Sequence, residues 1–434
     1  MRLFAVLSVL CVPIKFHEGT QRAQRVSKEH KVDFSQTVTH LMNKKVIRAG
    51  IVGSGFAAKF HYDALLRVFS TQVEMRGAYS PTAQKLEEFT GQRNLKAYDN
   101  LDKLIDDCDV IHVCTPPITH ESIVVSALGK GKHVIVEKPL TGYFGNGSED
   151  FNGDTFSKEV GLKHALQSIS RMLQAEKESE GKIMYAENWV YAPAIQKERE
   201  LLEKTGAQIL WMHGEESHSG SHSLTYGQWK FSGGGSMMGK GCHPLSAAIY
   251  LKHVEGRARN GKAIRPKTIS ARTHAITRMP GFKNEGHLRT TYTDIEDFAM
   301  LHVVFEDGTI ANLFASELVL GGVHNWIEVN TSNHRTICNI NPNNAMQAYT
   351  PSEQYFKDVY VVEKTETKQG WSSISPDEGW FAGYQHEMNE FYKTAAYGGA
   401  IESNSSLAAD VIATIYAGYV SAERKGAEVE VTIL

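Results

Sequence analysis

The regular hydrophobic pattern begins at Val46, where short apolar runs start to alternate with amphipathic stretches. The runs VIRAGIVG, QVEMRGAYS, DVIHVCTP and HVIVEKP are typical of buried strands, whereas AAKFHYDALLRVF and THESIVVSALGKG have helical spacing. A short strand at LKAY, a long helix over 156–177 and a strand at KIMYAENW are also predicted. Strands and helices that alternate in this way indicate βαβ units around a parallel sheet buried on both faces.

The pattern changes after about residue 188, where longer β-rich stretches such as AQILWMHGEESH and FAMLHVVFEDGTIANLFASELV alternate apolar and polar positions. Asp307-Gly308 within the second stretch is a hairpin signal. These features predict a large, mostly antiparallel open sheet, with two late helices around 381–396 and 407–425. We expect an α/β protein with an N-terminal Rossmann dinucleotide-binding domain over 44–188. A C-terminal α/β domain for substrate binding and oligomerisation should span 189–434.

Residues 1–43 lack this periodicity, and we expect them to have no function. The stretch MRLFAVLSVLCVPIKF is similar to a secretory signal but has no cleavage site, so an over-extended gene start before Met42 is the other interpretation. We expect the protein to be cytoplasmic, because its five cysteines are few and widely spaced, which favours free thiols in a reducing compartment. A net charge of -3 with no basic block argues against nucleic acid, and no apolar run is long enough to span a membrane.

The segment IVGSGFAAKFH carries the first chemical motif. Gly53, Gly55 and Ala58 have the spacing G-x-G-x-x-A, directly after a strand and at the start of a helix. Gly53 permits a tight turn, Gly55 lets the backbone approach a pyrophosphate, and Ala58 keeps the helix close to the strand. The turn, including Phe56 and Ala57, is therefore predicted to bind NAD or NADP through the N-terminus of the helix.

The sequence does not choose between NAD and NADP. An acid that would hold the ribose of NAD is absent at the end of the second strand, where Ser80 stands instead. Ser80 leaves room for a 2′-phosphate, but no arginine follows it. Further cofactor contacts are expected where strands of a parallel sheet end, at Thr115, Pro116 and Glu137, together with His120, which we interpret as a helix-start residue.

Lys138 follows the buried run VIVE and precedes a proline, which cannot donate a hydrogen bond to a sheet. This position puts a cation at the edge where the Gly-rich turn lies, within reach of a cofactor and a bound hydroxyl. Glu137 could fix or satisfy this cation. We expect burial to lower the pKa of Lys138 toward neutrality.

Together, AGIVGSGFAAKFH, TPP with His120, and EKP resemble the Gfo/Idh/MocA family, named after glucose–fructose oxidoreductase and inositol dehydrogenase. The resemblance runs from about Lys44 to the C-terminus. It implies a Rossmann domain followed by an open-sheet α/β domain, a nicotinamide cofactor, and a sugar or polyol substrate. It also implies that Lys138 contacts both cofactor and substrate, and that subunits pair through the open sheet as a homo-oligomer.

The second half matches the family less completely. GGGSMMGKGCHPL places His243 on the family's catalytic acid/base, but Gly239 replaces the family's aspartate. We expect Lys240, Tyr191 or a neighbouring histidine to substitute for that carboxylate. Asn188 matches the family's substrate segment, while Trp189 and Val190 replace its arginines, which disfavours anionic substrates. Trp229 could stack on a sugar ring or simply pack in the core.

His213, Glu216, His218 and His222 lie within ten residues and could form a metal site with His243. A polar, solvent-facing segment is the interpretation we favour, so no metal is expected. Carbohydrate-site polar residues are a third interpretation.

We therefore expect an NAD(P)-dependent oxidoreductase acting on CH–OH groups, with Lys138 and His243 as catalytic residues. Asn188, Tyr191, Trp229 and Lys240 are the expected substrate-binding residues. An alternative is an NAD-dependent glycoside hydrolase or lyase that works through transient sugar oxidation, motivated by the missing aspartate and the histidine cluster. A non-catalytic sugar or nucleotide sensor is a third class, against which Lys138 and His243 argue.

Overall fold

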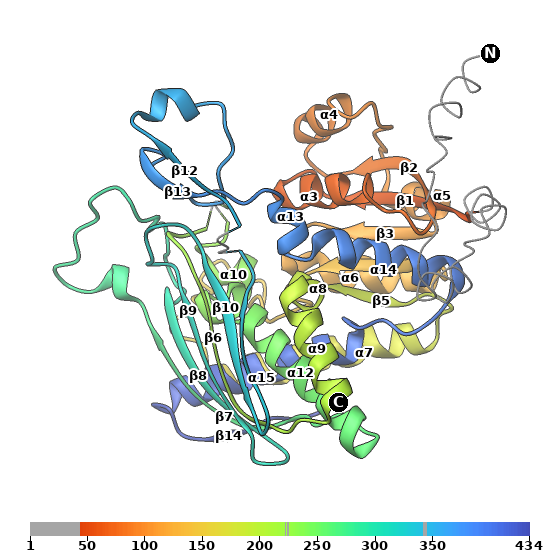
Figure 1. Ribbon diagram of the computed structural model, residues 1–434. Coiled ribbons are helices and arrows are strands. Elements are labelled where there is room, and N and C mark those ends of the chain that lie inside the picture. Colours follow the sequence, from red (N-terminus) through yellow and green to blue (C-terminus); the bar gives the residue numbers. More distant parts are fainter. Residues whose placement is uncertain (1–43, 222, 224, 342–344) are drawn as a thin grey trace, which may run out of the picture. The chain divides into compact units, whose positions relative to one another are not determined.

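Two separate sheets organise the computed structural model, which describes residues 44–221, 223, 225–341 and 345–434 (Figure 1). The first sheet has the strand order β2-β1-β3-β4-β5, and every pair in it is parallel. Its strands are β1 (Val46–Val52), β2 (Gln72–Tyr79), β3 (Val110–Val113), β4 (His133–Glu137) and β5 (Ile183–Ala186). The predicted parallel Rossmann sheet is thus confirmed.

The predicted strand at LKAY is wrong. Ala97 makes only an isolated parallel bridge with Ala78 of the edge strand β2. The chain leaves the sheet edge at once because Asn100 caps the next helix, α5 (Leu101–Asp107), by accepting a hydrogen bond from Lys103 N.

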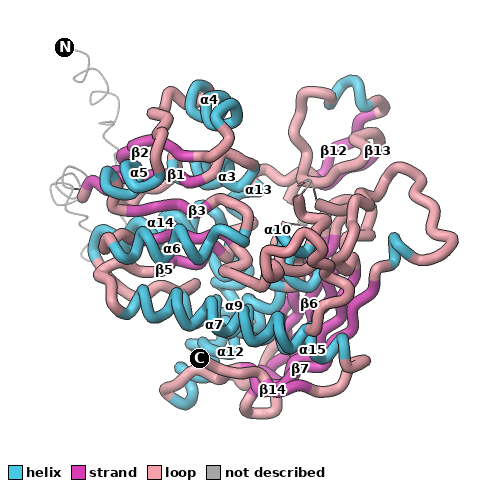
Figure 2. The backbone as a smooth tube through the Cα atoms, turned by 180° about the vertical axis from the view of Figure 1, so that it is seen from behind, coloured by secondary structure: helices cyan, strands magenta, loops and turns pink. Residues whose placement is uncertain are grey.

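Helices cover both faces of the parallel sheet. On one face lie α3 (Phe56–Leu65) and α14 (Tyr384–Tyr397), and α14 packs against both α3 and β1. Figure 2 shows the opposite face, where α5, α6 (His120–Gly129) and α7 (Lys158–Lys177) lie. The helical layer that contains α3 is therefore completed by α14, a helix from near the end of the chain.

The second sheet has the order β11-β10-β6-β9-β8-β7-β14 and is antiparallel except for the β6–β9 pair. This confirms the predicted large, mostly antiparallel sheet. Its strands are β6 (Ile209–Ser217), β7 (Pro266–His274), β8 (Phe298–Phe305), β9 (Ile310–Ser316), β10 (His324–Thr331), β11 (Arg335–Asn339) and β14 (Val429–Glu430). A separate hairpin joins β12 (Gln347–Thr350) to β13 (Gly370–Ser373).

Within the described residues, helices cover only one face of the second sheet. The helices α12 (Cys242–Asn260) and α15 (Ser405–Glu423) pack on it and are buried along most of their length. The other face leaves Trp211, Met300 and Ile337 exposed by 39%, 41% and 54%.

Short elements connect these layers. They are α4 (Ala83–Gly91), α8 (Asn188–Tyr191), α9 (Pro193–Thr205), α10 (Trp229–Ser232), α11 (Ser236–Gly239), α13 (Glu378–Phe381) and the 3₁₀ turns Pro117–Thr119, Ile276–Arg278 and Glu353–Phe356. Residues 46–434 form one compact unit, and the predicted domain boundary after residue 188 falls inside α8. The predicted leader over 1–43 lies outside the described residues.

None of the described helices is long and apolar enough to cross a membrane. The four cysteines within the described residues, Cys108, Cys114, Cys242 and Cys338, are buried free thiols. This agrees with the prediction of unpaired thiols for that part of the chain.

Candidate active site

The turn between β1 and α3 contains two glycines with different roles. Gly53 has φ +114°, and a Cβ there would lie 2.4 Å from the carbonyl oxygen of Cys114. Only glycine lets β1 end this close to β3. A Cβ at Gly55, in contrast, would meet nothing within 4 Å, so this exposed residue borders open space.

The same turn fits the pyrophosphate of a dinucleotide. Gly55 is the N-cap of α3, and no side chain caps this helix, so its first turn can receive phosphate oxygens. The Phe56 side chain is 60% exposed and Ala57 is partly exposed, so the turn faces solvent. Beyond β2, the Ser80 hydroxyl accepts a hydrogen bond from Ser54 Oγ at 3.1 Å.

The ends of β3 and β4 are tied together by His120. Its buried imidazole lies 2.9 Å from Thr115 O through Nε2 and 3.0 Å from Pro139 O through Nδ1. Burial lowers the pKa of His120, which keeps the ring neutral. His120 begins α6, as predicted, and it positions the backbone beside Lys138, while Pro116 stays exposed at this edge.

Lys138 crosses from the parallel sheet toward the start of α12. Its Nζ donates a hydrogen bond of 2.9 Å to Gly239 O. Burial alone would lower the pKa of Lys138, as we predicted. That prediction is wrong, because Cys242 and the carboxylates of Glu216, Glu137 and Glu187 raise the pKa more than burial lowers it. Lys138 therefore has a pKa above its ordinary value and stays a cation at neutral pH.

Glu137 holds the Lys138 backbone rather than its ammonium group. Its Oε2 accepts a 3.1 Å hydrogen bond from Lys138 N, and its Oε1 lies 3.0 Å from His61 Nε2. His61 Nδ1 lies 2.8 Å from His112 Nδ1, and His112 Nε2 lies 2.8 Å from the Tyr392 hydroxyl. A buried chain of polar groups thus runs from the end of β4 to α14 and fixes the Glu137 carboxylate.

His243 lies in the first turn of α12 between two buried carboxylates. Its Nδ1 is 2.6 Å from Glu187 Oε1, and its Nε2 is 3.7 Å from Glu216 Oε2. The ring also stacks on Trp189, with ring centroids 5.9 Å apart. Glu187 therefore supplies the orienting carboxylate that the sequence lacks at Gly239.

We had not singled out Glu187 from the sequence. It directly follows β5 and comes one residue before Asn188. Since ligand sites form at the carboxyl ends of parallel strands, an acid at that position was a readable signal.

Glu216 was considered only as part of a histidine-rich group, and the structure separates that group. Glu216 and His218 are buried, whereas His213 lies on the opposite face of β6 against Phe314 and Trp326. His222 lies outside the described residues.

The predicted substrate residues have protein partners. Asn188 Nδ2 donates to Ala382 O at 2.7 Å, and the Tyr191 hydroxyl donates to Glu390. Lys240 Nζ lies 2.5 Å from Glu317 Oε1. Trp229 is buried, with its Nε1 donating to Tyr143 O, an arrangement that favours its core-packing interpretation. Substrate binding by these four residues stays a prediction.

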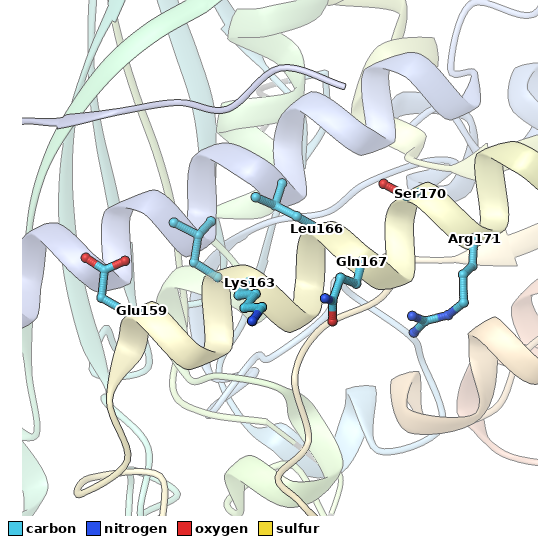
Figure 3. A pocket seen from close by; sticks show the side chains of 7 residues that line it. Glu159, Lys163, Leu166, Gln167, Ser170 and Arg171 are labelled. Carbon is cyan, nitrogen blue, oxygen red and sulfur yellow. The ribbon is translucent and has the colours of Figure 1, made fainter.

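A surface hollow lies along α7, and none of its lining residues belongs to the candidate site (Figure 3). A single helix supplies all of its lining. The lining residues are Glu159, Leu162, Lys163, Leu166, Gln167, Ser170 and Arg171.

The first part of the chain matches a known family. Residues 47–149 match the GFO_IDH_MocA family model, described as an oxidoreductase family with an NAD-binding Rossmann fold. This confirms the predicted nicotinamide dinucleotide cofactor class. Glucose-6-phosphate 3-dehydrogenase of Bacillus subtilis is 36% identical over 93 residues, 21% of this chain and 26% of that protein. UDP-N-acetylglucosamine 3-dehydrogenase of Acidithiobacillus ferrooxidans is 25% identical over 95 residues, 22% and 29% of the two chains.

The chain spans about a quarter to a half of the length of the first curated relatives it matches. Solved structures extend the likeness in fold to most of the chain. GenD2 from gentamicin A biosynthesis, solved in complex with NAD, has a TM-score of 0.70 at 21% identity, covering 89% of this chain and 97% of that one. Myo-inositol 2-dehydrogenase from Lactobacillus plantarum has a TM-score of 0.66 at 17% identity, covering 89% and 100%. Residues 47–149 thus match the Gfo/Idh/MocA family of oxidoreductases that the motifs predicted, and the solved structures show that most of the chain has a similar fold.

Proposed function

We propose that this chain is an NAD(P)-dependent oxidoreductase that transfers a hydride between nicotinamide and a carbinol carbon of a sugar, polyol or glycoside-like substrate. One contact carries the proposal. The hydrogen bond from Lys138 Nζ to Gly239 O brings the end of β4 to the segment that leads into His243. This contact supports the proposal that the two catalytic candidates, which are far apart in sequence, act in one site.

When bound, the nicotinamide supplies the hydride acceptor or donor. Lys138 holds the reacting oxygen with its positive charge, which the nearby carboxylates maintain. His243 removes or returns the hydroxyl proton. Its Nδ1 contact with Glu187 orients the ring and stabilises the imidazolium when the proton arrives.

The names of relatives support a carbohydrate-type substrate, since both relatives described above are dehydrogenases of sugar derivatives. We also propose that Asn188, Tyr191, Trp229 and Lys240 shape the substrate side of the site. Ser80, which replaces an acid after β2, leaves both NAD and NADP as cofactors within the proposal.

We further propose a cytoplasmic homo-oligomer. The face of the seven-stranded sheet opposite α12 and α15 presents exposed Trp211, Met300 and Ile337. Exposed apolar side chains on a sheet face suit pairing with a second copy. The buried free thiols suit a reducing compartment.

A sugar and polyol panel with NAD and NADP, followed by nicotinamide absorbance, tests the activity. With the substrate found, Lys138→Met and His243→Ala should each lower turnover by about 10²- to 10⁴-fold while the protein stays folded. The double variant should be little worse than the worse single variant, because both residues act on one proton transfer. Additive losses, or cleavage of a glycoside with no net change in nicotinamide absorbance, would contradict the proposal.

A further inference from the structure

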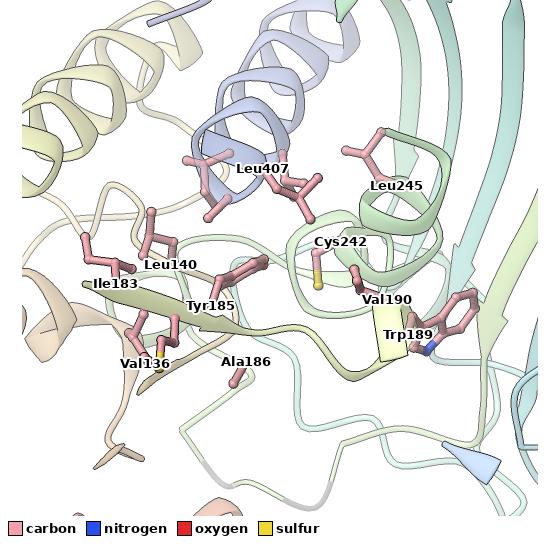
Figure 4. Close-up of a cluster of buried hydrophobic side chains, with 14 of the residues drawn as sticks. Val136, Leu140, Ile183, Tyr185, Ala186, Trp189, Val190, Cys242, Leu245 and Leu407 are labelled. Carbon is pink, nitrogen blue, oxygen red and sulfur yellow. The ribbon is translucent and has the colours of Figure 1, made fainter. Parts of the chain in front are cut away.

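Three side chains that can bind a metal, two of them already described in the candidate site, come together at the start of α12. One donor atom each from Glu187, Cys242 and His243 lies within 4.8 Å of the other two, and all three residues are buried. Cys242 and His243 begin α12, whereas Glu187 follows β5. Figure 4 shows the Cys242 sulfur in the buried cluster that also holds Tyr185, Val190 and Trp189.

Two carboxylate oxygens at this place lack a hydrogen-bond donor. Glu187 is fully buried, and its Oε2 has no partner; Glu216 is 7% exposed, and its Oε2 also accepts no hydrogen bond. Buried polar atoms are almost always paired, because an unpaired one loses its hydration without replacement. Each of these oxygens can therefore accept one more ligand, either a hydrogen-bond donor or a cation.

The donor set indicates which cation suits the place. Carboxylate oxygens alone would favour Mg²⁺ or Ca²⁺, but a thiol sulfur and an imidazole nitrogen favour a softer ion such as Zn²⁺. Three protein ligands of mixed type are also typical of catalytic zinc sites, which keep a fourth position open. The opposite nitrogen of His243, Nε2, faces Glu216 Oε2 at 3.7 Å. A carboxylate behind a ligating histidine is the usual second partner in such sites.

We propose that Glu187, Cys242 and His243 bind one Zn²⁺ ion, with the Glu216 carboxylate facing the imidazole from its other side. The inference rests on the proposed function, and it departs from the sequence-based expectation of no metal. The ion would replace the direct contact between His243 Nδ1 and Glu187, while Lys138 would still hold the reacting oxygen and Nε2 of His243 would still exchange the proton. The Lys138 cation beside Cys242 then balances the charge of the thiolate ligand.

The test starts with full-length protein treated with a chelator and dialysed. Zn²⁺ alone should then bind with a stoichiometry of one per chain, measured by calorimetry and elemental analysis. Co²⁺ alone should give an absorption band from charge transfer between thiolate and metal, which reports the sulfur ligand directly. Circular dichroism of each sample shows whether the fold is intact.

Variants assign the ligands. Cys242→Ser should abolish the cobalt band and weaken Zn²⁺ binding by at least about 100-fold. This loss should exceed the one expected when a residue that only contacts a ligand, such as Glu216, is changed. Glu216→Gln should weaken binding by about 10- to 100-fold and keep the band. Cys338→Ala, which changes a buried thiol on β11, is the matched control and should leave both signals unchanged. Should Cys242→Ser fail to fold, Glu187→Gln gives the same test through Zn²⁺ affinity.

The outcomes separate the two proposals. Absence of one-to-one binding, or a cobalt band that survives in Cys242→Ser, overturns the metal site. Full turnover of zinc-free protein also overturns it and leaves the proposed function intact. One-to-one binding that requires Cys242, in a protein without nicotinamide-linked turnover, supports the metal site and rejects the proposed function.

Discussion

The two sides of the candidate site differ in the groups that form them: backbone groups on one side and charged side chains on the other. The turn after β1 is made of backbone, with Gly53 and Gly55 leaving room for close approach and no side chain capping α3. The side around His243 is made of charged side chains, in which Glu187 and Glu216 flank one imidazole and Lys138 faces them. A backbone site offers partial charges that cannot titrate, whereas a side-chain site offers full charges that must be balanced. The first suits a constant phosphate group, and the second suits proton transfer.

Among the substitutions that test this comparison, the largest effect should come from neutralising the orienting carboxylate. Glu187→Gln leaves the shape of the site intact but removes the charge that faces His243 Nδ1, so turnover should fall by about 10²- to 10³-fold. The pH profile of kcat/KM should shift as well, because an imidazolium loses its stabilising partner. The substrate found with the panel above serves for the measurement. An unchanged rate and profile would show that Glu187 does not position the histidine.

A smaller effect is expected at Glu216, for which the same strand provides a control. Glu216 faces His243 from the buried side of β6, and Glu215 is the adjacent residue on the other side. Glu216→Gln should reduce turnover by about tenfold or more, whereas Glu215→Gln should not alter it. Equal effects of the two substitutions would contradict a role for the buried face of β6.

The backbone side can be tested by separating its two glycines. Gly55→Val should fold and weaken nicotinamide dinucleotide binding by at least tenfold, about 1.4 kcal/mol, because its side chain enters open space next to α3. Gly53→Ala should instead lower the free energy of unfolding, by about 1–3 kcal/mol or more, since φ +114° is strained for alanine and its Cβ would contact Cys114 O. Urea unfolding and fluorescence titration measure the two effects. The reverse pattern would mean that the roles of the glycines are exchanged.

The smallest effect is expected on the free energy of unfolding, which the buried carboxyl group of Glu387 makes dependent on pH. Burial, followed by the neighbouring carboxylates of Glu137 and Glu187, raises the pKa of Glu387 well above its usual range. Its Oε1 has no hydrogen-bond partner. At any pH between its unfolded-state and folded-state pKa values, Glu387 is protonated in the folded state and ionised in the unfolded state. Folding takes up this proton, so the contribution of Glu387 to stability rises as pH falls from its folded-state pKa toward its unfolded-state pKa.

Glu387→Gln should therefore stabilise the protein near pH 7.5 and flatten the dependence of the unfolding free energy on pH. Urea unfolding between pH 5.5 and 8 checks this, with the exposed Glu203→Gln as the control. Destabilisation of Glu387→Gln at pH 7.5 would show that the carboxylate is ionised in the folded protein.

The difference between the two sides also explains what the sequence could predict. Gly53 and Gly55 are neighbours in sequence, and the conformation they require is local, so their place at the end of β1 followed from the pattern. The partner of His243 could not be found in this way. Glu187 is 56 residues away, and the contact exists only because β5 and α12 meet in the fold. The pKa of Lys138 was mispredicted for the same reason, since the acids that raise it come from β4, β6 and the end of β5.

The position of α14 has a consequence for the order in which this protein can fold during synthesis. The helix covers the β1 and α3 side of the nucleotide-binding sheet, although it is encoded almost at the end of the chain. During synthesis, the five parallel strands emerge long before α14. Until α14 has been made, the part of the sheet face that it covers stays exposed. A fragment that ends after β5 would keep that face uncovered. The nucleotide-binding half is thus first in the sequence and among the last parts to be finished.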